Sequence, residues 1–398
     1  MRRVVAYVIG LGYYKLDVSG SRVSTHELGQ FSTFAKRVLY DTYNLTGAAQ
    51  TAAALRQPLV LAATVAPGWF AALGGGAGLP GGAPRFRCVV SIVGANGSTS
   101  MIVSDGSWRV SAGPAVTASI MDGETHDARL ETPGWQSAGY REGSGVWRPP
   151  SLLPVSRADC INYTSHAVMP PIRATQDYAP CDMWELQGRP GVYVFDFCQN
   201  MAAITTLHLR EGVQASVRIT QTFSESTLAA KPAGINRGMQ QFAKETNVYI
   251  TRGDGKAAAY RTGFTYAGFR YVELSGLPYV PDETTLEAHF VHTDMEPVGA
   301  ITFSDPLLVS IQRAARASAA SNFMHIPTDC PQRERRGWLG DAQLAAVAVT
   351  HMFDSGSAYS AFVQQISDAQ NEASGEVQDS RMLNTRRVSS FDDFKKYK

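Results

Sequence analysis

Residues 327–343 hold the densest group of side chains in this sequence that could do chemistry. Pro327 and Pro331 disfavour helical backbone around them, while Gly337 and Gly340 allow tight or left-handed turns. We therefore expect an ordered loop that carries its carboxylates on a fixed turn and not on a helix face. The group comprises the carboxylates Asp329, Glu334 and Asp341, the guanidinium groups of Arg333, Arg335 and Arg336, and the indole of Trp338.

This mixture of side chains suits a sugar ligand. Carboxylates accept hydrogen bonds from neighbouring hydroxyl groups, arginines donate to ring or linkage oxygens, and an indole face packs against the apolar C–H face of a pyranose. A carboxylic acid in the group could also protonate a glycosidic oxygen. The alternative is a structural loop whose charges pair with one another at a helix start, an arrangement that contributes little energy at a surface.

The loop contains the run Thr328-Asp329-Cys330-Pro331-Gln332-Arg333-Glu334-Arg335, followed by Gly337-Trp338 and Gly340-Asp341-Ala342. This order resembles the signature of the bacterial-type alpha-L-rhamnosidases, glycoside hydrolase family 78. The resemblance implies an inverting glycosidase in which Glu334 is the general acid. It also implies that Asp329, Arg333 and Asp341 hold the hydroxyl groups of the sugar. Trp338 is a further predicted substrate-binding residue, because its indole face can pack against the sugar.

Inverting hydrolysis needs a second carboxyl group, about 6.5 to 9.5 Å from the first, that activates water on the opposite face of the sugar. The resemblance implies that this general base is a glutamate far downstream, with no matching residue in the sequence. Glu372 and Glu376 are nearest by position, but their Gly- and Ser-containing surroundings are typical of solvated loops. His325 and His351 are alternative bases, although single histidines near helix ends are more often structural or exposed. We therefore expect this sequence to contain the general acid and to lack the general base.

The protonation state of Glu334 depends on its surroundings. To donate a proton at neutral pH, Glu334 needs a pKa raised by desolvation or by the like charges of Asp329 and Asp341. The neighbouring arginines act in the opposite direction. The sequence does not decide between these effects.

The composition favours a neutral ligand over nucleic acid or a membrane. The 398 residues carry 36 Lys and Arg against 35 Asp and Glu, and the net charge of +1 creates no long-range field toward phosphates or anionic lipid. Runs of about 18 apolar residues are absent, so no membrane span is predicted. Metal and nucleotide cofactors have no sequence support, because the His-Glu-x-x-His, Walker-type and dinucleotide motifs are missing. A carbohydrate is the predicted partner, and no oligomeric state is indicated.

The cysteines and the N-terminus bear on the cellular compartment. The odd number of cysteines and the lack of Cys-x-x-Cys spacing indicate neither a disulfide framework nor a zinc ribbon, although a single Cys160–Cys181 bridge stays open. The apolar run at residues 4–11 imitates a signal peptide, but Tyr7 and Gly10 interrupt it and no cleavage pattern follows. We interpret it as a buried strand, and the lack of an export signal favours a cytoplasmic location.

Residues 1–148 are predicted to form an all-β domain. Short segments rich in Val and Tyr alternate with Gly, Ser and Asn turns, and helical periodicity is scarce, which is typical of a β-sandwich. Ser104-Asp105-Gly106-Ser107-Trp108 and residues 123–129 resemble the amino-terminal domain of rhamnosidases, which implies a jelly-roll module of the carbohydrate-binding type. Strands are expected at residues 4–10, 14–18 and 38–43, with a hairpin turn at residues 19–21.

Residues 149–154 are the predicted linker, because Pro149 and Pro150 follow a Gly- and Ser-containing stretch without apolar periodicity. Residues 155–298 are predicted to form a second β-sandwich. Its runs Phe195-Asp196-Phe197 and Phe264-Thr265-Tyr266 resemble the concanavalin-like domain of the same family. Cys198 and Ala267 depart from the family pattern, in which a glycine and a histidine are expected, and this leaves the local turn geometry open. Alternating strands are expected at residues 191–197, 215–220 and 270–274.

Helical periodicity begins at residue 304 and predicts a third region over residues 299–378. Ser304 or Asp305 can cap a helix with Pro306 in its first turn, and further helices are expected at residues 342–353 and 357–369. The resemblance implies an (α/α) barrel of six helical hairpins. Twelve helices of about 11 to 12 residues, with their connections, need more chain than remains. Polar residues 379–398 are predicted to be a disordered tail.

The sequence therefore predicts a multidomain β plus α protein. Its fold is expected to comprise a jelly-roll and a concanavalin-like β-sandwich, followed by the first helices of an incomplete (α/α)6 barrel that is truncated within the catalytic domain. The predicted function is that of an alpha-L-rhamnosidase, a hydrolase that removes terminal alpha-L-rhamnose from rhamnosides. The alternative is a noncatalytic carbohydrate-binding remnant or a truncated product.

Overall fold

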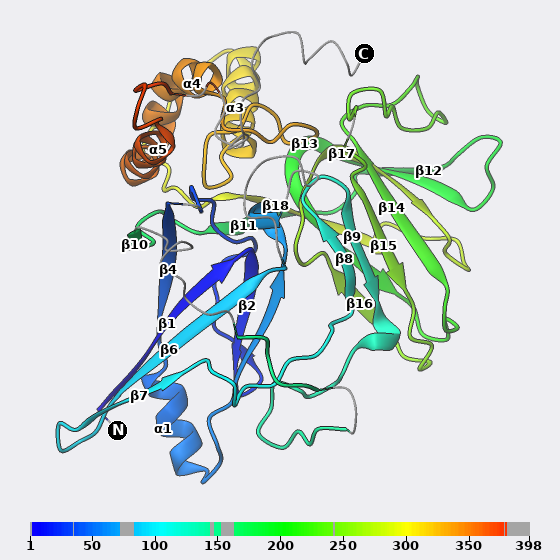
Figure 1. Ribbon diagram of the computed structural model, residues 1–398. Coiled ribbons are helices and arrows are strands. Elements are labelled where there is room, and N and C mark those ends of the chain that lie inside the picture. The colour runs from blue at the N-terminus through cyan, green and yellow to red at the C-terminus, as the bar shows by residue number, and fades with distance from the viewer. Residues whose placement is uncertain are drawn as a thin grey trace.

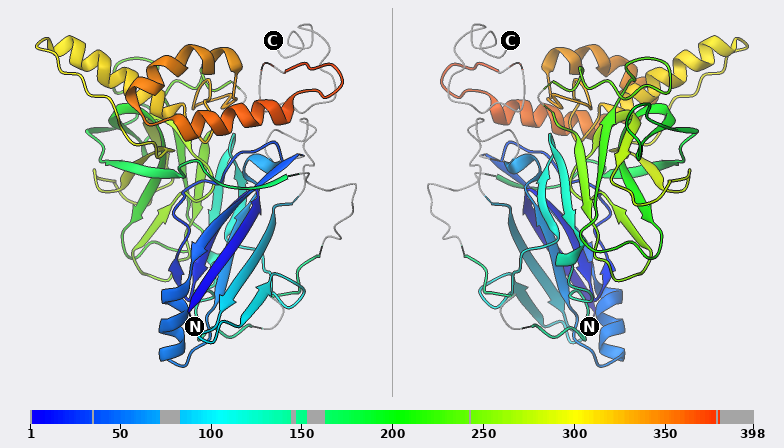
Figure 2. Two further views of the ribbon diagram at one scale, coloured as in Figure 1. Left: turned by 90° about the vertical axis from the view of Figure 1, so that its left-hand side faces the viewer. Right: turned by 90° about the vertical axis from the view of Figure 1, so that its right-hand side faces the viewer.

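The computed structural model describes residues 2–34, 36–71, 83–143, 147–152, 163–241, 243–377 and 379. Within these residues, β regions make up most of the molecule and the C-terminal helices lie together at one end (Figure 1, Figure 2). The predicted class, a multidomain β plus α protein, is confirmed. The predicted linker from residue 153 onward and the predicted tail, apart from residue 379, lie outside the described residues.

The first β region packs two sheets against each other. Val4, Ala6 and Val8 alternate along β1 and share an apolar cluster with Leu16 of β2, as a period of two residues predicts. In the described residues, the first sheet has the order β10-β4-β1-β6-β7 and comprises β1 (Arg3–Leu11), β4 (Arg37–Asn44), β6 (Arg85–Val93), β7 (Thr99–Val103) and β10 (Tyr163–His166). The second has the order β3-β2-β5 and comprises β2 (Tyr13–Val18), β3 (Ser21–Arg22) and β5 (Leu61–Ala66).

The strands predicted in this region are present as β1, β2 and β4, and the predicted hairpin turn joins β2 to β3. Helices α1 (Thr46–Ala54) and α2 (Gly68–Ala71) were not predicted. The signal for α1 was its alanine content, because alanine has the highest intrinsic helix propensity. Its residue Ala49 and the preceding Leu45 are buried against the first sheet.

The second β region is built around β13, which bends where its register with β17 shifts between Asp196 and Met201. The part before the bend pairs with β12, and the part after it pairs with β16 and β18. The sheet order is β11-β18-β13-β17-β14-β15-β9-β8. Its strands are β8 (Ala115–Ser119), β9 (Gly123–Asp127), β11 (Ile172–Tyr178), β12 (Asp182–Glu185), β13 (Val192–Leu209), β14 (Arg218–Ser224), β15 (Thr246–Ile250), β16 (Ala258–Arg261), β17 (Ala267–Ser275) and β18 (Leu286–Thr293).

The chain crosses between the two β regions on both sides of the predicted linker. β8 and β9 precede the linker but belong to the second region, where β9 pairs with β15 in parallel. β10 follows the linker but pairs with β4 of the first region. Gly123 lets the start of β9 lie close to the chain just before β15, because its φ of +106° and its closeness to the Thr246 carbonyl leave no room for a side chain. The two β regions are therefore interlocked.

A disulfide joins Cys181 to Cys198, whose Cα atoms lie 6.0 Å apart. The expectation that no disulfide is indicated is wrong, and the Cys160–Cys181 alternative fails because Cys181 is already bonded. The reason is the pairing of β12 with β13, in which the Cys181 N–H donates to the Asp196 carbonyl at 2.8 Å. Cys198 has a φ of +56°, which glycine adopts without strain, in agreement with the glycine expected at this position.

The C-terminal region contains α3 (Pro306–Ser321), α4 (Leu339–Met352) and α5 (Gly356–Ala369). The predicted cap of α3 is confirmed, since Oδ1 of Asp305 accepts from the Leu307 N–H at 2.8 Å. α4 begins at Leu339, earlier than predicted, so Asp341 lies in the first turn of a helix. This corrects the expectation that every carboxylate of the loop lies on a turn. The apolar run from Leu339 continues the helix, and the helix dipole favours an acidic first turn.

The helical region is fastened to the β regions by polar and apolar contacts. Arg37 pairs with Asp368, and its Nη2 donates to Oδ1 of that residue at 3.0 Å. Met324 and Ile326, which follow α3, lie in a core cluster shared with Tyr13 of β2. Other apolar side chains of the helices are exposed, namely Leu307, Ile311, Leu344, Val347 and Val363. None of the described helices is long and apolar enough to cross a membrane.

Candidate active site

The acid loop, residues 322–338, connects α3 to α4 and is buried at its start. His325 has a φ of +66° and is 1% exposed; its N–H donates to Thr293 Oγ1 at 2.7 Å. Its Nδ1 accepts from the Phe31 N–H of the first β region at 3.2 Å. Burial lowers the pKa of His325 to about 4. His325 is therefore a buried and weakly basic structural residue, which makes it unsuited to act as the general base.

Asp329 closes the turn that carries the predicted acid. Its Oδ1 accepts from the Arg336 N–H at 2.8 Å, and its N–H donates to the Arg336 carbonyl at 3.0 Å. The thiol of Cys330 donates to Oδ2 at 3.0 Å, and the Glu334 N–H donates to the Cys330 sulfur at 3.4 Å. Burial, followed by the bond to Asp329, raises the pKa of the Cys330 thiol. Both carboxylate oxygens of Asp329 thus hold the loop in shape.

Glu334 lies at the edge of this turn, with 25% of its side chain exposed. The indole N–H of Trp338 donates to Oε2 at 3.0 Å, and Arg333 Nε lies 4.0 Å from Oε1. Trp338 is the residue before α4, so the start of that helix fixes the indole against the carboxyl group. One oxygen of Glu334 is therefore held by a neutral donor, while the other faces the guanidinium group on the partly exposed side. A carboxyl group in this position can reach a ligand at the surface.

Arg335 turns away from this edge into the interior, where it contacts Glu245 and Tyr266. Sequence reasoning noted Tyr266 only as part of a family-like run and did not select Glu245. The two partners of the ion pair are 90 residues apart in the chain, so no local pattern indicated the contact. The only available signal was an isolated glutamate between segments with strand periodicity.

The remaining predicted residues are exposed. Asp341 is exposed on the first turn of α4. Glu372 has 83% of its side chain exposed and pairs with Lys36 at 2.9 Å, an interaction that lowers its pKa. Glu376 and His351 are also exposed. The structure thus brings Asp329, Arg333 and Trp338 together with Glu334, and it shows Glu372 and Glu376 as the solvated residues that their sequence context indicated.

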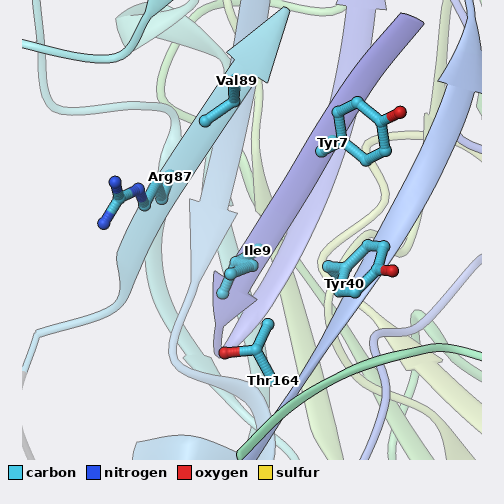
Figure 3. Close-up of a pocket in the computed structure, with 6 residues that line it drawn as sticks. All are labelled: Tyr7, Ile9, Tyr40, Arg87, Val89 and Thr164. Carbon is cyan, nitrogen blue, oxygen red and sulfur yellow. The ribbon is translucent and has the colours of Figure 1, made fainter. Parts of the chain in front are cut away.

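A surface hollow lies on the five-stranded sheet of the described residues, in the first β region (Figure 3). Tyr7 and Tyr40 meet edge to face, with ring centres 6.2 Å apart. The Arg87 guanidinium lies on one side of the hollow while the hydroxyls of both tyrosines point to the other (Figure 3). An active site combines an apolar pocket with polar groups that converge on it, whereas the polar groups of this hollow point in opposite directions. We therefore place the candidate active site at the acid loop. The hollow is lined by Tyr7, Ile9, Tyr40, Arg87, Val89 and Thr164.

Metal-binding side chains also cluster in the described residues, but their atoms are engaged. Asp177, Glu287 and His289 lie close together, yet Nδ1 of His289 contacts Asp177 at 2.6 Å and Nε2 contacts Thr206 at 2.7 Å. Cys181 and Cys198 lie near Asp196, but their sulfurs form the disulfide.

The sequence matches three domain families along its length. Residues 1–176 match the alpha-L-rhamnosidase N-terminal domain, and residues 186–292 match the bacterial alpha-L-rhamnosidase concanavalin-like domain. Residues 296–381 match the bacterial alpha-L-rhamnosidase 6 hairpin glycosidase domain. The last match contains the whole acid loop.

Curated relatives and solved structures agree with these matches. An alpha-L-rhamnosidase of Streptomyces avermitilis is 30% identical over 377 residues, covering 92% of this chain and 34% of the relative. One from Formosa agariphila is 29% identical, covering 90% of this chain and 37% of the relative. The solved alpha-L-rhamnosidase from Dictyoglumus thermophilum superposes with a TM-score of 0.84 at 31% identity, covering 96% of this chain and 41% of that one.

The solved Streptomyces avermitilis alpha-L-rhamnosidase, which is complexed with L-rhamnose, superposes with a TM-score of 0.83 at 28% identity. It covers 95% of this chain and 35% of that one. The chain thus spans between a third and about two fifths of the length of these relatives.

Proposed function

The chain belongs to the bacterial alpha-L-rhamnosidase family, and on that basis we propose that it supplies the general acid of a glycosidase that removes terminal alpha-L-rhamnose from rhamnosides with inversion. Glu334 is the acid in this proposal, and its proton goes to the glycosidic oxygen as the bond to the sugar breaks. The observation that carries the proposal is the position of Glu334, held by Trp338 at 3.0 Å and one quarter exposed at the edge of a rigid turn.

The neighbours of Glu334 are assigned to substrate binding. Arg333 can donate to sugar oxygens from beside the acid, and the Trp338 ring can pack against the apolar face of the sugar. Asp329 and Asp341 are proposed to accept hydrogen bonds from sugar hydroxyls. For Asp329 this adds to its bonds within the loop, since each carboxylate oxygen can accept more than one bond.

The general base is proposed to lie outside the residues that the structure describes. An inverting base must be about 6.5 to 9.5 Å from the acid, across the sugar. Asp329 is occupied in shaping the acid loop, and Glu372 is exposed and paired with Lys36. Hydrolysis by the 398-residue chain is therefore expected to be slow, because water lacks an activating carboxylate.

Azide tests this proposal, because it is an anion that attacks carbon without a base. With phenyl alpha-L-rhamnoside as substrate, azide forms a C–N bond at the anomeric carbon, the C–O bond breaks, and the proton of Glu334 goes to the departing phenol oxygen. We expect the purified chain to release phenol slowly in buffer and at least about tenfold faster with azide.

Two results would contradict the proposal. Efficient hydrolysis in buffer alone would show that a base is present among these residues. Absence of phenol release with and without azide would show that the acid loop of this chain does not act on rhamnosides.

A further inference from the structure

Arg335 directs the acid loop into the protein interior. Its side chain is buried immediately after Glu334, and its backbone has a φ of +54°. A non-glycine residue at positive φ is strained, so this conformation persists only where surrounding contacts enforce it. The contacts of Arg335 therefore determine the direction in which the chain leaves Glu334.

The guanidinium group of Arg335 is held by the loop itself and by the second β region. Its Nε donates to the Pro331 carbonyl at 2.6 Å, which ties the turn together. Its Nη2 donates to Oε1 of Glu245, and the group lies 4.3 Å from the centre of the Tyr266 ring. Cation and ring attract each other most strongly where water is excluded, as here.

Glu245 is the fixed end of this anchor. It is 2% exposed just before β15, and its Oε1 also accepts from the Gly268 N–H at 3.1 Å. The loop packs directly on that backbone, because a Cβ atom at Gly268 would lie 2.7 Å from the Gln332 nitrogen. A buried guanidinium group is costly to leave without an acceptor, and Oε1 of Glu245 can accept from it whether the carboxyl group is protonated or ionised, so this contact fixes the geometry of the loop.

We propose that Glu245 is a positioning residue for Glu334, acting through Arg335. It holds the turn so that the Glu334 carboxyl group meets the Trp338 indole and faces the substrate side. The role of Glu334 as acid rests on the proposed function, but the contact between Glu334 and Trp338 exists without substrate. The positioning role can therefore be tested separately from turnover.

Glu124 offers a matched control within the same β region. It is also 2% exposed, and its carboxylate accepts from the Phe264 N–H at 2.8 Å and the Tyr260 hydroxyl at 2.8 Å. Its partners lie outside the acid loop. Replacing either glutamate with methionine removes a buried acceptor at similar volume, so the two variants share a loss of stability and differ in their link to Glu334.

The test is the indole N–H signal of Trp338 in the ¹⁵N-labelled full chain, assigned by its loss in Trp338→Phe. Glu334→Ala gives the signal position with the hydrogen bond broken. We expect Glu245→Met to move the Trp338 signal toward that position. Glu245→Gln keeps an acceptor oxygen for Arg335 and Gly268 and should leave the signal near its wild-type position, as should Glu124→Met.

If the Glu245→Met variant does not fold, the Arg335→Lys variant is tested in its place. The single ammonium group of lysine cannot reach both Pro331 and Glu245 while also covering the Tyr266 ring. The same movement of the signal is expected. An unchanged Trp338 signal in folded Glu245→Met or Arg335→Lys would overturn the positioning role, as would an equal movement in Glu124→Met. A failure of rhamnoside turnover alone would contradict the proposed function and would not contradict the positioning role of Glu245.

Discussion

The position of Glu334 depends on contacts of very different strength. The bond from the Trp338 indole is partly exposed, and such a bond contributes about 1 kcal/mol. The Arg335–Glu245 pair is fully buried, and removing one partner of such a pair costs about 3 to 5 kcal/mol. The anchor behind the loop therefore dominates its placement, and the indole refines the direction of the carboxyl group.

Glu245 also makes stability depend on pH. Burial raises its pKa to about 8, against the opposing effects of Arg335 and the Gly268 N–H and together with a small contribution from Glu225. Because the folded-state pKa exceeds the ordinary value, the folded protein favours the protonated form. This contribution to stability is complete at low pH and is lost as the pH rises through about 8.

We therefore expect the free energy of unfolding of the wild type to fall relative to that of Glu245→Gln by on the order of 3 kcal/mol between about pH 6 and about pH 9. Urea unfolding at several pH values measures this difference, with Glu124→Gln as the control for loss of a buried carboxyl group. A difference between wild type and Glu245→Gln that stays constant across this range would show that Glu245 does not titrate as its burial implies.

At the scale of elements, local patterns predicted the strands and helices but not the way they are joined. The Val- and Tyr-rich segment at residues 4–10 identified β1, and the Asp305–Pro306 pair identified the start of α3. The bend of β13 was not predicted, because it depends on pairing with strands that are distant in sequence. The disulfide was missed for the same reason.

The disulfide is expected to stabilise the β12–β13 pairing. Its cysteines are 17 residues apart, and a bridge closing a loop of this length contributes about 2 to 4 kcal/mol by restricting the unfolded chain. Cys181→Ser should therefore lower the free energy of unfolding by that amount in the absence of reductant. Thiol reductant should lower the wild type by a similar amount and leave Cys181→Ser unchanged. A wild type unaffected by reductant would contradict a stabilising role for this bond.

At the scale of the whole molecule, the acid loop is where the β and helical regions meet. Met324 and Ile326 of the loop share a core cluster with Tyr13 of the first β region and Tyr266 of the second. The motif around Glu334 was sufficient to predict the family and the candidate acid. It could not predict Glu245, because that contact depends on how the second β region packs beneath the loop.

The described helices leave apolar surface uncovered. α3, α4 and α5 expose apolar side chains such as Leu344 and Val363, and the chain spans only part of the length of its relatives. What these residues do supply is a carboxyl group held at a fixed position. The proposed glycosidase activity therefore depends on Glu334 as the proton donor.

The most direct measurement compares leaving groups in Glu334→Gln. With azide present, release from phenyl alpha-L-rhamnoside requires a proton, whereas release from the dinitrophenyl rhamnoside does not. We predict that Glu334→Gln lowers phenol release by about 10² to 10⁴ and leaves dinitrophenol release nearly unchanged, while Glu372→Gln changes neither. An equal effect on both substrates, or no effect on phenol release, would contradict the assignment of Glu334 as the acid.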